Sequence, residues 1–282
     1  MSKTSALYIV ATPIGNLGDI SARALDTLKS VDCIAAEDTR HSSKLLNYFD
    51  INRPIFSLHE HNESKNTEIL LNRLQQKQSI ALISDAGTPT ISDPGYILIN
   101  KTREIGIPVI PIPGPCALIA ALSASGLNCQ QFVFAGFLPT KQTTRQAKLK
   151  DLFYETRTII FYEAPHRILD LIEDLITVLG HKRYVVLARE LTKKFETIYG
   201  NTLDQLKHWL DNNKNQQKGE FVVLVKGNEH AFTHSAVETK RILKLLLDEL
   251  PIKKAAALAS KITHEKKNKL YAQALALTGK TI

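Results

Sequence analysis

Polar residues that could bind a ligand follow a run of strand-forming residues at Ile80–Ile83. The run leads directly into the loop SDAGTPTISDPG at residues 84–95. A carboxylate such as Asp85 at a strand end can accept a hydrogen bond from a hydroxyl or ammonium group, and Gly87 allows a ligand to approach the backbone closely. Because ligands bind at the carboxyl ends of strands in open α/β sheets, the loop indicates a binding site. A βα turn capped by Asp85 is the alternative.

Two other strand ends carry polar clusters. The sequence EDTRHS (37–42) could cap a helix over Ser42–Phe49 through Thr39 or Ser42, or could form part of a site. The sequence HEHNE (59–63) lacks the second histidine of the HExxH zinc motif. The three cysteines are scattered and form no CxxC pair. We therefore expect no metal site.

Two proline- and glycine-containing loops join strands to helices. The loop ATPIGNLGD (11–19) follows the first strand, and PGPCA (113–117) precedes an apolar helix over Leu118–Ser125. Helix N–H groups at such a junction can face a ligand. Neither loop contains GxGxxG or a P-loop lysine, which excludes a standard Rossmann fingerprint and a P-loop ATPase.

The elements that position these loops alternate between strand and helix, which predicts a mostly parallel sheet. After Gly126 the pattern changes, and we interpret the rest as a second α/β domain with a ligand cleft between the two. The predicted domains are residues 1–117, 118–230 and 231–282. The expected strands are Leu7–Ala11, Cys33–Ala36, Ile55–Leu58, Ile80–Ile83 and Val109–Ile112, then Phe132–Phe137, Thr158–Tyr162, Tyr184–Ala188 and Glu220–Val225.

The composition is that of an ordinary globular protein, with 282 residues, 44% hydrophobic and 23% charged. Apolar runs are too short to span a membrane, and the N-terminal run is too short for a secretory signal. We expect a cytoplasmic protein with reduced thiols.

The net charge of +8 is concentrated at the C-terminal end. Residues 231–282 contain ten Lys or Arg and four Asp or Glu, a balance of 10 − 4 = +6. We expect a helix over Val237–Leu250 and two shorter helices around Thr263-His264. A helix-turn-helix-like appendage that contacts nucleic acid is one interpretation. Close helix packing through Ala255–Leu258, with lysines in solvent, is the other.

Eight segments in order resemble one protein family. They are ATPIGNLGDI, AEDTRHS, SDAGTPTISDPG, PIPGPCA, FAGFLP, FYEAPHRI, ARELTKKFE and KGEFV, and they extend over nearly the whole chain. The chain resembles the tetrapyrrole-methylase-like group of S-adenosylmethionine (SAM) enzymes. Within this group it resembles the branch that methylates a cytidine ribose 2′-oxygen of small-subunit (16S) ribosomal RNA.

This resemblance implies a homodimer that binds SAM between two α/β domains and acts on the small ribosomal subunit. Pro13 and Gly15 would shape the entrance for the acceptor. Tyr162 and Glu163 would come from the second domain. The implied cofactor-binding residues are Pro13, Asp85, Gly87, Thr88, Pro115, Cys116, Ala117 and Tyr162.

A ribose hydroxyl needs a base to take its proton during attack on a methyl group. Candidate bases near strand ends are Glu37, Asp38, Glu163, His166 and Glu190. We favour His166 or Glu190, with Glu163 also assigned to the catalytic group; a helix-capping or packing role is the alternative for His166. The residues expected to contact RNA are Arg40, His41, Arg167, Arg189, Lys193 and Lys194, together with lysines of the tail. Tyr162, Phe195 and Tyr199 are candidates to stack on a base.

Two other functions compete with this interpretation. A methylase of a small tetrapyrrole would leave the basic tail without a role. A non-catalytic RNA-binding protein on a methylase scaffold would predict damaged ligand loops, but the DAGTP and PGPCA sequences are complete.

Overall fold

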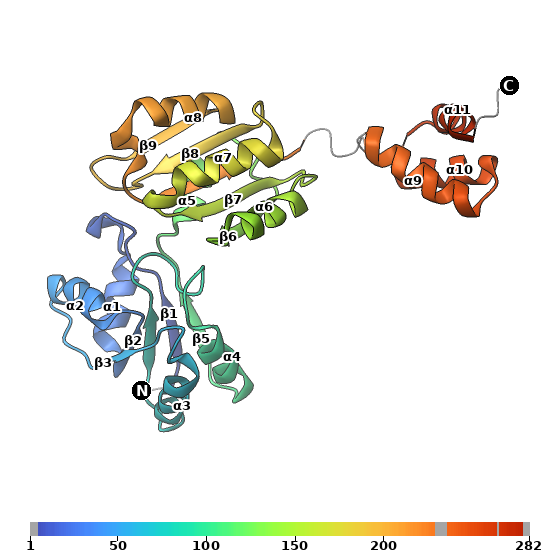
Figure 1. The fold of residues 1–282 in the computed structure, drawn as a ribbon. Coiled ribbons are helices and arrows are strands. Elements are labelled where there is room, and N and C mark those ends of the chain that lie inside the picture. The colour runs from blue at the N-terminus through green and yellow to red at the C-terminus, as the bar shows by residue number, and fades with distance from the viewer. Residues whose placement is uncertain (1–4, 229–235, 264, 279–282) are drawn as a thin grey trace. The chain divides into compact units, whose positions relative to one another are not determined.

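The computed structural model describes residues 5–228, 236–263 and 265–278 (Figure 1). The chain divides into two compact units. The first comprises residues 1–150 and 158–226, and the second comprises residues 151–157 and 227–282. The expected α/β fold with two sheets and a C-terminal helical region is confirmed. The boundaries of the three predicted domains stay predictions.

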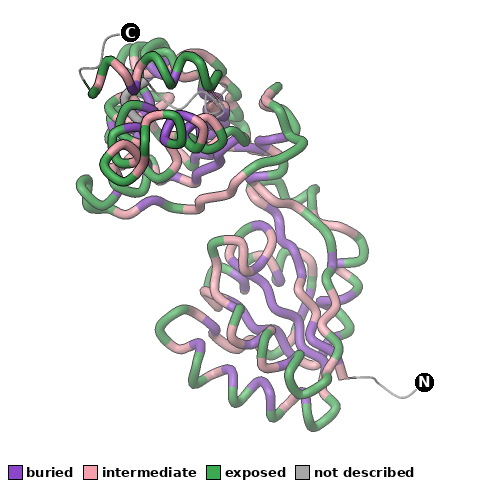
Figure 2. Tube along the Cα trace, turned by 90° about the vertical axis from the view of Figure 1, so that its right-hand side faces the viewer, coloured by how far each residue is buried: buried purple, intermediate pink, exposed green. Residues whose placement is uncertain are grey.

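The first sheet, predicted to be mostly parallel, is entirely parallel, with strand order β3-β2-β4-β1-β5. Successive side chains along its hydrophobic strands point to opposite faces of the sheet and therefore pack into two different cores. Ile80 and Leu82 pack with helices α3 and α4, whereas Ala81 and Ile83 pack with α1 and α2. Strands β2 and β4 are buried along their whole length, and Figure 2 shows buried stretches in this part of the chain. The elements are β1 Leu7–Val10, α1 Ala22–Ser30, β2 Cys33–Ala36, α2 Thr39–Tyr48, β3 Ile55–Ser57, α3 Glu63–Gln75, β4 Ile80–Ile83, α4 Tyr96–Glu104 and β5 Val109–Ile112, with a 3₁₀ turn η1 at Leu17–Asp19.

The second sheet is mixed, with order β6-β7-β10-β8-β9. In this sheet β6 and β7 pair in parallel, and a register shift between Phe134 and Gly136 interrupts the pair. Strand β9 was missed by the sequence analysis. The elements are α5 Ala117–Ala124, β6 Phe132–Phe137, α6 Gln142–Asp151, β7 Thr158–Glu163, α7 Ile168–Leu179, β8 Tyr184–Arg189, β9 Thr197–Thr202, α8 Leu203–Asn212 and β10 Phe221–Val225, with 3₁₀ turns η2 at Pro165–Arg167 and η3 at Lys214–Gln217.

The second unit contains the three expected C-terminal helices, α9 Ala236–Glu249, α10 Ile252–Thr263 and α11 Lys267–Thr278. Ala256 and Ala259 are fully buried against Leu243 and Leu270. Small side chains at these positions let the helices approach closely, which agrees with the packing interpretation for Ala255 and Ala256, whereas Leu258 is 41% exposed. His264 lies outside the described residues. No helix in the described parts of the chain has the length and apolarity needed to cross a membrane.

Candidate functional site

The site is built on the loops that follow β1 and β4, which are neighbouring strands in the first sheet. The chain leaves β1 toward β2 on one side and leaves β4 toward β5 on the other. This reversal is the topological switch point at which open α/β sheets bind ligands. Two backbone hydrogen bonds tie the loops together, from Thr12 N–H to Gly87 O (2.8 Å) and from Gly87 N–H to Thr12 O (3.0 Å). Gly87 has φ +82°, which a residue with a side chain rarely adopts.

The loop after β4 is anchored by a carboxylate that the sequence analysis did not recognise. Glu63, almost fully buried at the start of α3, accepts hydrogen bonds from the N–H groups of Gly95 and Ile97, each at 2.9 Å. These N–H groups belong to the N-terminus of α4 and would otherwise lack partners. Within the same loop, Thr90 and Ser92 have positive φ angles. Glu63 therefore holds a backbone whose conformation is unfavourable on its own.

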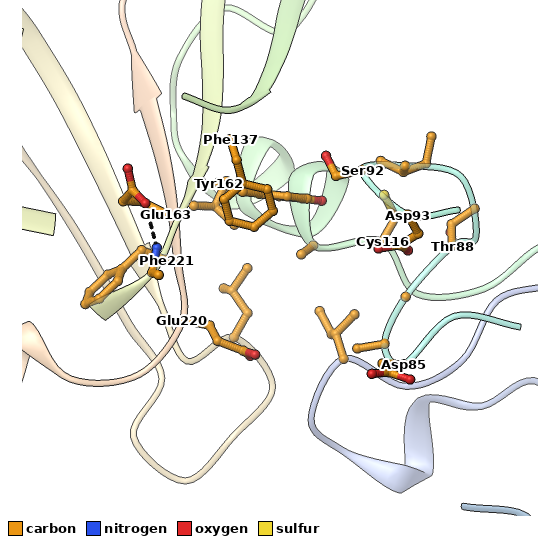
Figure 3. Close-up of a pocket in the computed structure, with 18 of the residues that line it drawn as sticks. Asp85, Thr88, Ser92, Asp93, Cys116, Phe137, Tyr162, Glu163, Glu220 and Phe221 are labelled. Atoms are coloured by element: carbon orange, nitrogen blue, oxygen red, sulfur yellow. Dashed lines mark hydrogen bonds between the residues drawn. The ribbon is translucent and has the colours of Figure 1, made fainter. Parts of the chain in front are cut away.

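These loops line a cavity of about 450 Å³, whose other wall comes from the second sheet (Figure 3). We call it the acidic cavity. It is lined by five carboxyl side chains, and its apolar lining includes Ile14, Ile91, Phe137, Leu191, Phe221 and Val222. The carboxyl groups belong to Glu37, Asp85, Asp93, Glu163 and Glu220. None of the described residues that line the cavity is Lys, Arg or His. Such a lining favours a ligand that is partly apolar and carries positive charge.

Two of these carboxyl groups titrate near neutrality. Burial raises the pKa of Glu37 to about 7, with repulsion from Asp93 and Asp85 as the next causes. Burial also raises the pKa of Asp93 to about 6, although a hydrogen bond with Ser84 opposes the shift. Both groups lose their protons between mildly acidic and neutral pH. A positive charge placed between them would favour their ionised forms.

Tyr162 and Glu163 enter the cavity from the end of β7. The Tyr162 hydroxyl accepts a hydrogen bond from the N–H of Leu118 (3.1 Å), and its ring contacts Phe134 and Phe137 edge-on. Burial raises the pKa of Tyr162, so the phenol stays protonated. The Glu163 carboxylate accepts from Ala164 N–H (2.9 Å) and pairs with Arg167 (3.3 Å), and burial raises its pKa.

A second pocket of about 360 Å³, which we call the side pocket, adjoins the acidic cavity. Ile14, Asp85, Ala86 and Glu220 line both. The rest of its lining is different, because it includes His41, Lys44 and Lys193 and, among apolar or aromatic side chains, Leu17, Leu45 and Tyr48. The described residues therefore form two neighbouring pockets that differ in their charged side chains.

The sequence places this fold in a family. Residues 6–207 match the family described as Tetrapyrrole (Corrin/Porphyrin) Methylases. The chain belongs to the tetrapyrrole methylase family. Residues 233–278 match the RsmI C-terminal HTH domain.

Relatives cover this methylase-family chain almost completely. It is 54% identical over 273 residues to the Ribosomal RNA small subunit methyltransferase I of Escherichia coli O157:H7, covering 97% of this chain and 96% of that protein. It is 52% identical over 275 residues to the protein of the same name from Haemophilus influenzae, covering 97% of each. Among solved structures, a diphthine synthase matches with a TM-score of 0.60 and 16% identity over 79% of this chain and 90% of that one. That likeness shows the shared fold.

The structure brings together most of the residues that the sequence predicted to bind the cofactor. Asp85, Gly87, Thr88, Cys116, Ala117 and Tyr162 line the acidic cavity. Pro115 accepts a hydrogen bond from the Thr88 hydroxyl (2.9 Å) through its carbonyl, and Pro13 lines the side pocket. Their roles stay predictions.

Two of the three predicted catalytic residues lie elsewhere. His166 is exposed in the turn η2 and lines neither pocket. Glu190 also lines neither, since its Oε1 accepts from Lys193 Nζ and from Glu220 N–H, both at 3.0 Å. Although burial raises the pKa of Glu190, these hydrogen bonds outweigh it and the pKa is lowered overall. This geometry favours a structural role for Glu190. Glu163 alone of the three reaches the cavity.

Several residues predicted to contact RNA bind other parts of the protein. Arg189 is buried and donates to the carbonyl oxygens of Lys218 (2.5 Å) and Phe195 (2.9 Å). Arg167 donates to the carbonyl of Leu138 (2.6 Å). These contacts favour structural roles over RNA contacts. Lys193 pairs with Glu190 and Glu220, and Lys194 lies over the Phe195 ring, which is largely exposed.

The polar cluster after β2 differs from the expectation in one respect. Asp38, rather than Thr39 or Ser42, caps α2, because its Oδ1 accepts from the Arg40 N–H (2.8 Å). The helix consequently begins three residues earlier than predicted. Hydrogen bonds from Arg40 lower the pKa of Asp38 to about 2.

The structure disfavours the prediction that Tyr199 stacks on an RNA base, since the Tyr199 ring is already stacked on Trp209 at 4.3 Å.

Proposed function

We propose that this protein transfers a methyl group from SAM to the ribose 2′-oxygen of a cytidine in small-subunit (16S) ribosomal RNA. The observation that carries the proposal is identity of 52–54% along almost the whole chain to proteins named Ribosomal RNA small subunit methyltransferase I. The similarity includes the C-terminal helical region as well as the two sheets. The proposed setting is the cytoplasm, with a homodimer acting on the small ribosomal subunit.

The acidic cavity fits SAM in size and in charge. A volume of about 450 Å³ falls in the range of small-molecule sites. SAM supplies an electrophilic methyl group on a positively charged sulfonium, and it also carries an ammonium group. The carboxyl groups of the cavity suit both cations, whereas the apolar wall suits an adenine ring. Asp85, Thr88 and Tyr162 are the polar residues of the predicted set that would hold it.

The same lining argues against a cofactor that carries phosphate groups. Phosphates are bound by Arg, Lys or clustered backbone N–H groups, and the described lining of the cavity has no basic side chain. This agrees with the lack of a phosphate-binding motif in the sequence.

The proposed reaction requires a base, since the ribose hydroxyl must lose its proton as it attacks. The carboxyl groups of the cavity wall are better placed for this than His166 or Glu190, which line neither pocket. The chain can obtain much of its rate from alignment of the two reactants by rigid loops. The hydrogen bonds between Thr12 and Gly87 and the anchoring of the loop by Glu63 support such rigidity.

RNA affinity would come from exposed cations, including Arg40, His41, Lys194 and the lysines of the C-terminal helices. A methylase of a small tetrapyrrole remains the second candidate, favoured by the description of the matched family. Its substrates carry several carboxylates, which the five carboxyl groups of the acidic cavity would repel.

The test measures transfer of labelled methyl groups from SAM to three acceptors in parallel. These are purified small ribosomal subunits that lack the modification, naked 16S rRNA and a tetrapyrrole precursor. We expect label in the ribose of one cytidine of the subunits or the rRNA. Label only in the tetrapyrrole would support the second candidate. RNA binding without transfer to any acceptor would contradict both enzymatic proposals.

A further inference from the structure

One face of helix α2 carries side chains that do not pack in the protein core. The core-facing positions of α2 are Ser42 and Leu46, which are buried. His41, Lys44, Leu45 and Tyr48 occupy positions i, i+3, i+4 and i+7 and therefore share another face of the helix. All four line the side pocket. Tyr48 on this face is 65% exposed, so packing in the core does not explain an aromatic side chain at this position.

The charges of this face are available for a ligand. Lys44 and His41 are exposed, and neither forms an ion pair with any residue that the structure describes. Lys193, which also lines the side pocket, differs because it pairs with Glu190 and Glu220. An exposed aromatic ring beside unpaired cations is the combination that binds single-stranded nucleic acid, by stacking on a base and attraction to phosphates.

The side pocket also lies next to the acidic cavity, where the methyl donor would bind. Asp85 and Glu220 are the carboxyl groups that line both pockets. Glu220 Oε2 already accepts a hydrogen bond from Lys193 Nζ at 2.6 Å. Asp85 accepts one hydrogen bond, through Oδ1 from the N–H of Asp38 (3.1 Å), and this contact leaves Oδ2 for a further donor.

We propose that the side pocket binds the acceptor nucleotide, with its base against Tyr48, its phosphate near Lys44 and His41, and its ribose 2′-hydroxyl at Asp85. This inference rests on the proposed function and names the substrate-binding part of the same site. The volume of about 360 Å³ suits one nucleotide. The other occupant to consider is the methionine end of SAM, whose carboxylate would also pair with the cations of α2, and the SAM affinities of the variants below distinguish the two.

Asp85 then has a definite task in the transfer. The 2′-oxygen forms a bond to the methyl carbon while the carbon–sulfur bond breaks, and that bonding pair stays on sulfur as a neutral thioether. The hydroxyl proton passes to Asp85 and then to water. One positive charge disappears from the donor and one proton is released, so the charges balance.

The experiment uses the full-length protein and unmodified small ribosomal subunits. Tyr48→Ala should raise KM for subunits about tenfold, while Tyr48→Phe should stay close to wild type because the ring remains. Calorimetric Kd values for SAM should be unchanged in both variants. Tyr96→Ala is the matched control, because Tyr96 is 72% exposed and lines neither pocket. Asp85→Asn should lower kcat at saturating SAM about a hundredfold with a small change in KM for subunits, whereas full activity restored by excess SAM would assign Asp85 to cofactor binding alone and overturn its role as the base.

Ultraviolet cross-linking of the enzyme–subunit complex, followed by peptide mass spectrometry, gives a readout that does not depend on turnover. We expect nucleotide adducts on the peptide that contains Tyr48. The inference is overturned if adducts occur only on peptides outside residues 13–17 and 41–48, or if Tyr48→Ala leaves KM unchanged. It is also overturned if Tyr48→Ala weakens SAM binding as much as subunit binding. If wild-type protein methylates no subunit, the proposed function itself fails, which is a separate outcome.

Discussion

The acidic cavity and the side pocket share four residues but differ in the side chains that line the rest of each. The first gathers carboxyl groups and, in its described lining, no cation, whereas the second exposes Lys44, His41 and an aromatic ring. The difference suits two reactants of opposite charge, a cationic methyl donor and an anionic polynucleotide. Asp85 lies on the wall between them. Binding of each reactant can therefore be tested separately, because a substitution at a residue that lines only one pocket should affect the binding of only one reactant.

The largest effect is expected from filling the acidic cavity. Ala117→Phe should weaken SAM binding more than about a hundredfold, since the new ring occupies space that the ligand needs. Binding of the protein to small subunits should change by less than about twofold, because Ala117 does not line the side pocket. Calorimetry and filter binding measure the two affinities. Ala124→Phe, at an exposed position of the same helix, is the control; equal loss of RNA binding in Ala117→Phe would refute the separation.

Removing the anchor of the β4 loop should have the next largest effect. Glu63→Ala removes the acceptor for two N–H groups, which should lower the free energy of unfolding by about 2–4 kcal/mol. Because this loop carries Ile91, Ser92 and Asp93 into the acidic cavity only, SAM affinity should fall about tenfold at temperatures where the protein is folded. Thermal unfolding and calorimetry provide the measurements. Glu63→Gln keeps an acceptor oxygen and should lose much less; equal effects of both variants would exclude the anchoring role.

Lowering the pH should weaken SAM binding by neutralising the cavity. Glu37 with a pKa of about 7 and Asp93 with a pKa of about 6 are ionised at about pH 8 and mostly protonated at about pH 5. The Kd for SAM should therefore rise on acidification by about tenfold, while that of the thioether product, which keeps the ammonium group but lacks the sulfonium charge, should change less. Glu37→Gln should flatten the dependence. A product affinity that follows pH as steeply as SAM affinity would argue against charge recognition.

The stability of the ligand-free protein should show the opposite trend. Both pKa values are raised in the folded protein, so these carboxyl groups bind protons more readily there than in the unfolded chain. Their contribution to stability is present in acid and is lost as pH rises through about 6 to 7. The stabilisation that SAM adds should increase over the same range. Thermal unfolding of wild type and Glu37→Gln at several pH values separates the two effects.

The smallest effect is expected from a single cation of the side pocket. Lys44→Ala should weaken subunit binding modestly and reduce the slope of log K against log salt by about one unit. SAM affinity should not change. Asn47→Ala is the control on the same helix, because Asn47 is exposed and lines neither pocket. An unchanged salt slope in Lys44→Ala would mean that the lysine contacts no phosphate.

The sequence predicted the first sheet well, because its strands are short apolar runs bounded by glycine, proline and acidic residues. Strand β9 escaped notice because it lies at an edge and its sequence TIYGNT contains glycine and polar residues. The start of α2 was misplaced because several residues in EDTRHS can cap a helix, and only the structure shows that Asp38 does so.

The site was predicted in part, for a topological reason. Searching for polar residues at the carboxyl ends of strands found Glu37, Asp85 and Glu163, and the family resemblance added Tyr162. It missed Glu220 and Phe221, since β10 is antiparallel to both of its neighbours and brings its amino end to the same edge. The search also could not tell in which direction a side chain points, which explains why His166 and Glu190 were favoured. Glu63 was missed because its partners are backbone groups 32 and 34 residues away.

The central claim is that the protein joins a methyl group to a ribose oxygen rather than to a base. Nucleoside mass spectrometry of unmodified small subunits, before and after incubation with the protein and SAM, tests it most directly. The account predicts that 2′-O-methylcytidine appears in the 16S rRNA, and that Asp85→Asn greatly slows its formation. Methylation of a nucleobase with no 2′-O-methylcytidine would contradict it.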